Sequence, residues 1–189
     1  MPTPSLLIRP STAADLPAIT AIYAKAVLHG TGTFELDPPD LPEMARRRDD
    51  VLSKGLPWLV AQAPGQSRGQ GQVLGYAYAN HFRPRPAYRF CLEDSIYLHP
   101  DARGQGVGRV LLAELLGRCE AAGARQMLAV IGDAANAGSI GVHAALGFAH
   151  SGVLKASGWK FDRWLDVVLM QRALGPGAAL PAPADMPNA

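Results

Sequence analysis

The stretch Arg103-Gly104-Gln105-Gly106-Val107-Gly108 decides the fold, because its alternate glycines join an apolar strand to an amphipathic helix. The expected strand, Arg89 to Leu98, ends before Pro100, and an i, i+4, i+8, i+12 stripe then runs from Val107 to Cys119. At such a junction, unpaired backbone N–H groups meet the positive end of the helix dipole. Glycines let a phosphate approach the backbone, and Arg103 adds positive charge. The stretch therefore predicts an anion-binding turn, with a turn that merely connects two elements as the alternative.

The spacing within this turn excludes two common nucleotide-binding loops. A P-loop requires Lys-Ser or Lys-Thr after its last glycine, and neither pair is present. A dinucleotide-binding fingerprint requires G-x-G-x-x-G and an acidic residue at the end of the next strand. Here the spacing is G-x-G-x-G, and the next strand ends at Val130-Ile131-Gly132. The turn is therefore expected to bind a phosphate group, but not in the manner of a P-loop or of a dinucleotide-binding fold.

The rest of the chain alternates between helical and strand patterns. Upstream of the turn we expect a strand at 6–8, a helix at 13–29, a helix at 40–55, and strands at 58–63 and 73–82 joined by a polar hairpin tip at 64–71. Downstream we expect a strand at 127–131, a short helix at 136–146, and strands around 148–155 and 164–171. The predicted fold class is α/β (α+β): a central mixed β-sheet with helices on both faces. Residues 1–173 are expected to form one domain, and residues 174–189 a disordered Pro/Ala-rich tail.

The composition fits one globular domain and excludes several functional classes. At 189 residues the chain is little longer than a typical domain of roughly 150. Its 48% hydrophobic and 18% charged residues argue against both disorder and a membrane span. A net charge of +2, with the basic run at 46–48 followed by Asp49-Asp50, argues against nucleic-acid binding. The N-terminus lacks a signal-peptide pattern, which predicts a cytoplasmic protein. The cysteines, Cys91 and Cys119, match neither a disulfide framework nor a metal site.

A second motif follows one strand after the glycine-rich turn. It runs from Asn136 to Phe148 and reads N-A-G-S-I-G-V-H-A-A-L-G-F. Together the two motifs resemble the signatures of the GNAT acetyltransferase superfamily, whose R/Q-x-x-G-x-G/A turn binds the pyrophosphate of acetyl-CoA. The resemblance implies acetyl-CoA as co-substrate and no metal. It also implies a coenzyme site made by strand residues that pair with the pantetheine amides, the turn, and the second motif: Ile96, Tyr97, Leu98, Arg103, Gly104, Gln105, Gly106, Val107, Gly108, Asn136 and Ser139.

Three further segments, 32–39, 92–98 and 158–168, resemble the phosphinothricin acetyltransferase-like branch, the L-amino acid N-acetyltransferases. The resemblance covers roughly residues 6–172 and implies a homodimer that acetylates a small-molecule amine. By the same resemblance, Phe34, Glu35 and Arg83 bind the acceptor, the last through a carboxylate. The branch often carries Lys-His-Gly where this chain has Lys160-Phe161-Asp162, and a later His where it has Leu165. Specificity for the herbicide itself therefore does not follow.

Two residues are candidates for the chemistry. Period-2 alternation places Glu93 on one face of its strand, where a carboxylate could take a proton from the substrate ammonium, and the family has a Glu in this role. The alternative is a surface acid. His143 lies two helical turns after Asn136 and could donate to the departing thiolate or act as a second base; the alternative is a core histidine. The family also implies a β-bulge that turns an N–H near Leu98 toward the thioester oxygen.

Three functions remain open on the sequence. The first is transfer of acetyl to the α-amine of a small amino acid or analogue of the phosphinothricin, methionine sulfone or methionine sulfoximine type, in a ternary complex. The second is the same transfer to a polyamine, an aminoglycoside or a protein N-terminus, although Arg83, Arg85, Arg89 and Lys160 flank the site and would repel a cationic acceptor. The third is a non-catalytic acyl-CoA-binding sensor, which needs the turn but not Glu93.

Overall fold

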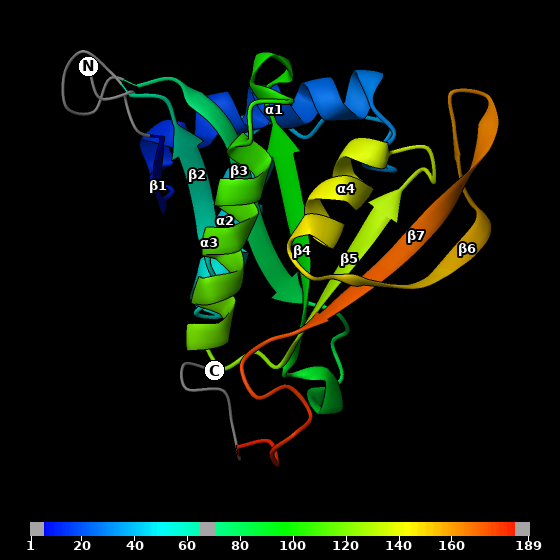
Figure 1. Ribbon diagram of the computed structural model, residues 1–189. Helices are drawn as coiled ribbons and strands as arrows, with labels where there is room; N and C mark the ends of the chain where they lie inside the picture. Colours follow the sequence, from blue (N-terminus) through cyan, green and yellow to red (C-terminus); the bar gives the residue numbers. More distant parts are fainter. Residues whose placement is uncertain (1–5, 65–70, 184–189) are drawn as a thin grey trace.

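The structure is a computed structural model that describes residues 6–64 and 71–183 of the chain. Figure 1 shows a central sheet between two layers of helices. In chain order the elements are β1 (Leu7–Pro10), η1 (Ala13–Asp15), α1 (Leu16–His29), α2 (Leu41–Ser53), β2 (Trp58–Gln62), β3 (Val73–His81), η2 (Pro86–Tyr88), β4 (Cys91–Leu98), η3 (Pro100–Ala102), α3 (Val107–Ala121), β5 (Gln126–Gly132), α4 (Ala137–Ala145), β6 (Ala149–Lys160) and β7 (Arg163–Ala173). Most of the predicted hairpin tip, 65–70, lies outside the described residues.

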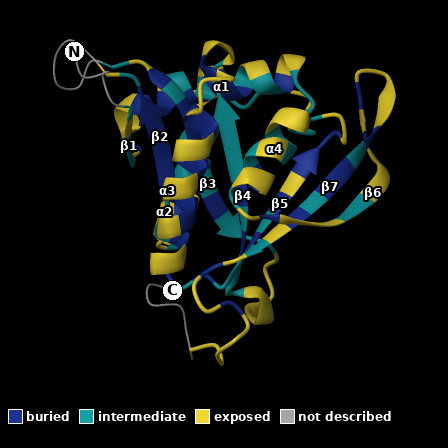
Figure 2. Ribbon diagram, viewed as in Figure 1, coloured by how far each residue is buried: buried dark blue, intermediate teal, exposed yellow. Residues whose placement is uncertain are grey.

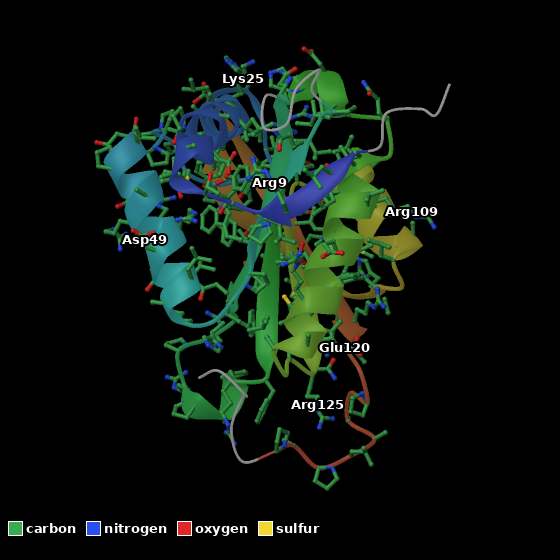
Figure 3. The ribbon with its side chains drawn as sticks, turned by 90° about the vertical axis from the view of Figure 1, so that its left-hand side faces the viewer. Arg9, Lys25, Asp49, Arg109, Glu120 and Arg125 are labelled. Carbon is green, nitrogen blue, oxygen red and sulfur yellow. The ribbon has the colours of Figure 1, made fainter. Side chains whose placement is uncertain are left out.

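The described strands form one seven-stranded mixed sheet in the order β1-β2-β3-β4-β5-β7-β6, which confirms the predicted fold class. Among these pairs, β4 with β5 is parallel and the others are antiparallel. Helices α1 and α2 cover one face, and α3 and α4 the other (Figures 1 and 3). Figure 3 labels Asp49 on α2 and Glu120 on α3, and both residues are exposed, so both helix layers present polar side chains to solvent.

The core follows from the apolar stripe of α3. The predicted stripe residues Val107, Leu111, Leu115 and Cys119 are all buried, at 5% exposure or less. They pack on β2 and β3, which are largely buried because helices cover both their faces (Figure 2). Burying such side chains stabilises the domain by about 1.5–3 kcal/mol each. The outer parts of α4 and of β6 remain exposed.

Several element boundaries differ from the sequence prediction. Residues 13–15 form a 3-10 turn, and α1 starts only at Leu16 with Pro17 in its first turn. Strand β6 extends to Lys160 rather than 155, and β7 begins at Arg163, because Phe161 and Asp162 have φ of 53° and 54° and make a two-residue hairpin turn. A register shift between Leu154 and Gly158 interrupts the alternation of β6, which is why the pattern alone ended the strand early.

Strands β4 and β5 separate toward their C-terminal ends. Their parallel pairing extends from Cys91↔Gln126 to Asp94↔Ala129 and stops there within the described residues. Strand β4 continues to Leu98 paired with β3, and β5 continues to Gly132 paired with β7. The two strands therefore diverge, as the arrowheads in Figure 1 show. The register between β3 and β4 carries no shift up to Leu98, so the expected bulge is absent from this described pair.

The first part of the expected tail packs on the domain. Leu174 is 1% exposed, and its amide donates to the carbonyl of Arg125. The guanidinium of Arg125, labelled in Figure 3, donates to the carbonyls of Gly177 and Pro181. Leu174 therefore adds to the core, while disorder of the tail as a whole stays a prediction. Residues 184–189 lie outside the described residues.

Candidate active site

A cavity of about 920 Å³ lies where β4 and β5 separate. Its walls come from the loop after α1, the second half of β4, the turn before α3, the end of β5, and α4. The predicted site residues in its lining are Phe34, Glu93, Ile96, Tyr97, Leu98, Arg103, Gly104, Gly106, Gly108, Asn136, Ser139 and His143. Among the described residues that line it, Glu35, Arg83, Gln105 and Val107 do not appear.

The turn before α3 has the backbone shape that its glycines allow. Gly104 and Gly106 have φ of 73° and 79°, a conformation that costs other residues about 1–2 kcal/mol. Gly106 is the N-cap of α3, so the first amides of the helix lie beside it without acceptors of their own. Arg103 and Arg109 also line the cavity. This arrangement fits a pyrophosphate, because amides, helix dipole and positive charge converge on open space.

The remaining residues of the turn shape it from within. Val107 is buried, and the side-chain amide of Gln105 donates to the carbonyl of Asp101. A Cβ on Gly108 would lie 3.2 Å from Leu98 Cδ1, so this glycine lets α3 pack closely on β4. Gln105 and Val107 therefore hold the turn in shape rather than lining the cavity with their side chains.

The start of α4 forms the wall next to the end of β5. The Asn136 side chain caps the helix by accepting a hydrogen bond from the Ser139 amide at 3.2 Å. A Cβ on Gly32 would lie 3.6 Å from Asn136 Nδ2, so this amide group also reaches the loop after α1. Asn136 and Ser139 are thereby fixed by the helix cap at the cavity wall.

Glu93 and His143 reach the cavity from opposite faces of β4. Tyr97, on the same face as Glu93, contacts Tyr23 of α1 edge to face, with ring centroids 4.8 Å apart. Asp94, on the other face, bonds His143 of α4. Both faces line one cavity because β5 is no longer paired to β4 beyond Asp94.

Glu93 is half-buried, and its surroundings favour the neutral acid. Burial raises the pKa of the Glu93 carboxyl above its usual range, and the negative charge of Asp94 raises it further. The charge of Arg83 acts in the opposite direction, so Arg83 lies close enough to influence Glu93. A carboxyl with a raised pKa at a cavity wall is suited to accept a proton near neutral pH.

His143 has both ring nitrogens engaged. Its Nε2 lies 2.9 Å from Asp94 Oδ2, and its Nδ1 lies 2.7 Å from the carbonyl of Ser139. A carbonyl only accepts, so Nδ1 carries a proton, and an ionised Asp94 requires a proton on Nε2 as well. Burial lowers the pKa of His143, but the hydrogen bond and charge of Asp94 raise it more. The geometry therefore does not support His143 as the second base, because no lone pair of its ring is free.

Asp94 is the site residue that the sequence reading missed. Its side chain is 2% exposed and lines the cavity. The signal was present in the alternation of β4, where Asp94 shares a face with Leu92, Ile96 and Leu98. A carboxylate among apolar residues on the buried face of a strand needs a partner elsewhere in the chain.

Phe34 enters the cavity from the loop after α1 and rests on glycines of two strands. A Cβ on Gly158 of β6 would lie 2.2 Å from the Phe34 ring, and one on Gly132 of β5 would lie 3.2 Å from it. Lys160, also on β6 and 3% exposed, donates to the carbonyl of Thr33 at 2.9 Å. These contacts attach the loop to the C-terminal hairpin and fix the position of the ring.

Glu35 has a different role from the one predicted. It accepts hydrogen bonds from Tyr23 Oη at 2.9 Å and from the guanidinium of Arg47 at 2.6 Å. Because the carboxylate joins the loop to α1 and α2, it is not directed at the cavity. Arg83 lies outside the cavity lining, with its guanidinium over the Phe82 ring at 4.8 Å. Its influence on the site is through its charge next to Glu93.

Three large aromatic side chains are exposed at the end of the β6–β7 hairpin. Trp159 is 53%, Phe161 50% and Trp164 63% exposed. The two tryptophans are cross-strand partners in edge-to-face contact, with ring centroids 5.2 Å apart. The described residues contain no group of His, Cys, Asp and Glu arranged to hold a metal ion. Within the same residues, no helix combines the length and apolarity needed to cross a membrane.

Comparisons with known proteins agree with this geometry. The model of the acetyltransferase (GNAT) family matches residues 29–148. The chain is 58% identical over 163 residues to a phosphinothricin N-acetyltransferase of Alcaligenes faecalis, covering 86% of this chain and 80% of that protein. It is 41% identical over 177 residues to an L-methionine sulfoximine/L-methionine sulfone acetyltransferase of Pseudomonas aeruginosa, covering 94% and 99%. The crystal structure of a phosphinothricin acetyltransferase from Sinorhizobium meliloti in complex with acetyl-CoA superposes with a TM-score of 0.90 at 49% identity, covering 96% and 95%.

Proposed function

The chain belongs to the acetyltransferase (GNAT) family, and from this premise we propose that its acceptor is the α-amine of a small amino acid or analogue of the phosphinothricin, methionine sulfone or methionine sulfoximine type. The protein is an N-acetyltransferase that uses acetyl-CoA as its co-substrate. The acceptor class is the part that rests on similarity to the relatives and on the residues around Glu93.

One observation carries the proposal: the glycine turn and Glu93 line the same cavity, at the point where β4 and β5 separate. The turn, Asn136 and Ser139 supply amides and polar groups for the phosphates and the coenzyme arm. The unpaired side of β4 between Ile96 and Leu98 offers backbone groups to the amides of the same arm. Glu93 then faces the acceptor from the other side of the sheet.

The reaction requires a neutral amine and a departing thiol. Acetyl-CoA supplies the acetyl group as a thioester: the amine nitrogen bonds to the carbonyl carbon, and the C–S bond breaks with its electron pair on sulfur. The ammonium loses two protons, of which one ends on that sulfur and the other in solvent. Glu93 accepts the proton that the ammonium loses before the attack, directly or through a water, and passes it to solvent. Its raised pKa suits this step near neutral pH.

Transfer is proposed to be direct, within a ternary complex. Neither cysteine is placed to carry an acyl group, since Cys119 is buried in α3 with its pKa raised by burial and Cys91 does not line the cavity among the described residues. A thiol that stays protonated is a poor nucleophile. The amine therefore attacks the thioester itself.

The acceptor class is supported by the charge near Glu93. Arg83 lies within electrostatic reach of this carboxyl, and a guanidinium beside the base suits an acceptor with a carboxylate or phosphinate. A polyamine or aminoglycoside would bring positive charge toward that same guanidinium. An acyl-CoA sensor would not require a carboxyl whose pKa is raised next to the cavity.

Two further expectations remain part of the proposal. A homodimer is supported by the exposed Trp159, Phe161 and Trp164, because a cluster of large apolar side chains on one edge favours association. Sedimentation of the protein and of Trp164→Ser tests it, with a monomeric wild type as the contradicting result. A cytoplasmic location is supported by Cys91 and Cys119, which are both free thiols.

The experiment that tests the proposed function is thiol release from acetyl-CoA by the purified protein. The panel contains methionine sulfone, methionine sulfoximine, phosphinothricin, free amino acids, polyamines and aminoglycosides. Turnover on the amino-acid analogues with little on the cationic amines is the expected result. Preferred turnover of a polyamine would contradict the acceptor class, and acetyl-CoA binding without turnover of any amine would favour the sensor.

A further inference from the structure

The carboxylate of Asp94 is buried at the wall of the cavity, on the face of β4 opposite Glu93. Its side chain is 2% exposed, as is that of His143, and the two meet at 2.9 Å. Its second oxygen, Oδ1, is buried and has no hydrogen-bond partner in the described part of the chain. Burying a carboxylate with one unpaired oxygen costs free energy of folding. The pair is therefore poorly explained by a contribution to stability alone.

We propose that Asp94 is a positioning residue of the acetyl transfer, which holds His143 as a fixed imidazolium beside the cavity. In this arrangement His143 supplies positive charge to the departing sulfur, and Glu93 alone accepts the proton of the amine. This proposal rests on the proposed function. It gives a role in the reaction to Asp94, whose side chain lies on the opposite face of β4 from that of Glu93.

The hydrogen bonds of the imidazole ring carry the argument. The Ser139 carbonyl at 2.7 Å can only accept, so it fixes a proton on Nδ1. The ring can then be neutral only if Asp94 is protonated and donates to Nε2. Stacked edge to face against Phe148 at 5.0 Å, the ring is not free to turn away from these two acceptors. Two acceptors on opposite sides of a buried ring favour the doubly protonated form.

The groups that face the pair from the neighbouring elements are neutral or acidic. From β4, the Glu93 carboxyl lies on the opposite face of the strand, and the charge of Asp94 adds to burial in raising its pKa. From α3, Cys119 faces Asp94 as a protonated thiol, its pKa raised by burial and by that carboxylate. From α4, Ser139 adds a carbonyl oxygen and a hydroxyl 3.4 Å from Nδ1. His143 is thus the positively charged partner of Asp94.

The same geometry assigns the protons of the reaction. The His143 imidazolium neither gives up nor takes a proton. Its positive charge stabilises the electron pair that stays on sulfur when the C–S bond breaks. Of the two protons lost by the amine, Glu93 takes the first and passes it to solvent, and the second ends on sulfur. Fixed charges of this kind act mainly on the transition state, so their loss lowers kcat rather than raising KM.

The first test measures the protonation of His143 without any turnover. Nitrogen-15 NMR of the histidine rings, assigned with His143→Gln, reports whether both ring nitrogens carry protons. Both are expected to be protonated at pH 7 in the wild type, and one in Asp94→Asn. A neutral His143 at pH 7 in the wild type would overturn the proposal, whatever the substrate of the enzyme.

The second test separates a positioning role from a structural one. Asp94→Asn is expected to lower kcat about 10- to 100-fold with both KM values within twofold, because one fixed charge is lost. Both limbs of the kcat/KM profile against pH should move to lower pH, since Asp94 raises the pKa of Glu93 and of His143. The matched control is Asp15→Asn, which removes another buried, ion-paired carboxylate remote from the cavity. It should lower stability without moving the profile.

The double variant Asp94→Asn/His143→Gln completes the test. Removing both charges together should recover the thermal stability lost in His143→Gln, because that single variant leaves the Asp94 carboxylate buried without its partner. The kcat is expected to stay low. If kcat recovers together with stability, or if Asp94→Asn leaves the pH profile unmoved, the pair is structural only. Activity of the wild type on the amine panel decides the proposed function separately.

Discussion

The two ends of the cavity are built in different ways. The proposed coenzyme end is six consecutive residues, 103–108, whose shape depends on glycines at positive φ and on the start of α3. The proposed acceptor end joins segments that are distant in sequence: the loop at 31–35, Glu93 on β4, and Gly158 and Lys160 on β6. A ligand site made by local backbone is readable from a motif, whereas a site made by tertiary contacts depends on which segments the fold brings together.

The largest expected effect concerns the acceptor end. Glu93→Gln keeps the shape of the side chain and removes the proton acceptor, so kcat/KM should fall about 10²- to 10⁴-fold. In the wild type, kcat/KM should rise with pH through a pKa above the usual range of Glu, because burial and Asp94 favour the protonated acid. Steady-state thiol release across pH measures both effects.

The control for this variant is Glu114→Gln, an exposed acid on α3 that pairs with Arg118. It should keep wild-type kinetics. Retention of more than about a tenth of the activity in Glu93→Gln would assign the base elsewhere. If binding at one end of the cavity does not depend on the other end, Glu93→Gln should bind acetyl-CoA with the wild-type Kd. Calorimetry measures this.

The next effect concerns the coenzyme end. Gly106→Ala places a Cβ on a residue with φ of 79°, a strain of about 1–2 kcal/mol that should raise the Kd for acetyl-CoA about 5- to 30-fold. Gly117→Ala, in the middle of α3 with no described atom within 4 Å of the added Cβ, is the matched control. It should leave the Kd unchanged and raise the melting temperature. Equal Kd values for both variants would contradict a backbone-encoded cradle.

A smaller effect tests the long-range contact that positions Phe34. Gly158→Ala would place its Cβ 2.2 Å from the ring, so the ring must move, and the acceptor KM should rise about tenfold. The KM for acetyl-CoA should not change. Combining it with Phe34→Leu should restore part of the acceptor affinity. Gly141→Ala on α4, where no described atom lies within 4 Å of the added Cβ, is the control. A rise in both KM values would show that the hairpin serves both ends.

The smallest effect is expected from Arg83, because its side chain is exposed. Arg83→Gln should raise the KM of amino-acid acceptors about two- to fivefold and leave that of an amine without a carboxylate unchanged. The acid limb of kcat/KM should move to higher pH, since the charge of Arg83 lowers the pKa of Glu93. Arg85→Gln, two residues away on the same exposed segment, should do neither. Equal losses for both classes of amine would exclude a carboxylate contact.

The sequence predicts the fold class and the shape of the glycine turn well, because both depend on short-range patterns. The apolar stripe of α3, the glycine turn and the cap at Asn136 are contiguous, and the structure contains each of them. Resemblance to a family supplied Phe34 and Glu93, but also Glu35, which the structure uses to join its loop to Arg47. A carboxylate next to an aromatic residue in a loop has many possible partners, and local sequence does not select among them.

The tertiary contacts could not be predicted in the same way. The Asp94–His143 pair joins residues 49 positions apart, and Lys160 reaches Thr33 across 127. The separation of β4 from β5 leaves no trace in either strand, because alternation reports which face is buried and not which neighbour is paired. The register shift in β6 interrupts the alternation of its residues, so the sequence pattern did not predict the second half of this strand.

The separation of β4 from β5 also has a consequence for the stability of the protein. From Ser95 to Leu98, one side of β4 is an unpaired sheet edge inside the domain rather than at its rim. Backbone groups of such an edge exchange their amide hydrogens readily until an extended ligand pairs with them. In the proposed complex the coenzyme arm takes the place of a missing strand segment, and the folded state is expected to become more stable as acetyl-CoA rises above its Kd. Cells poor in acetyl-CoA would hold this enzyme in its least protected form.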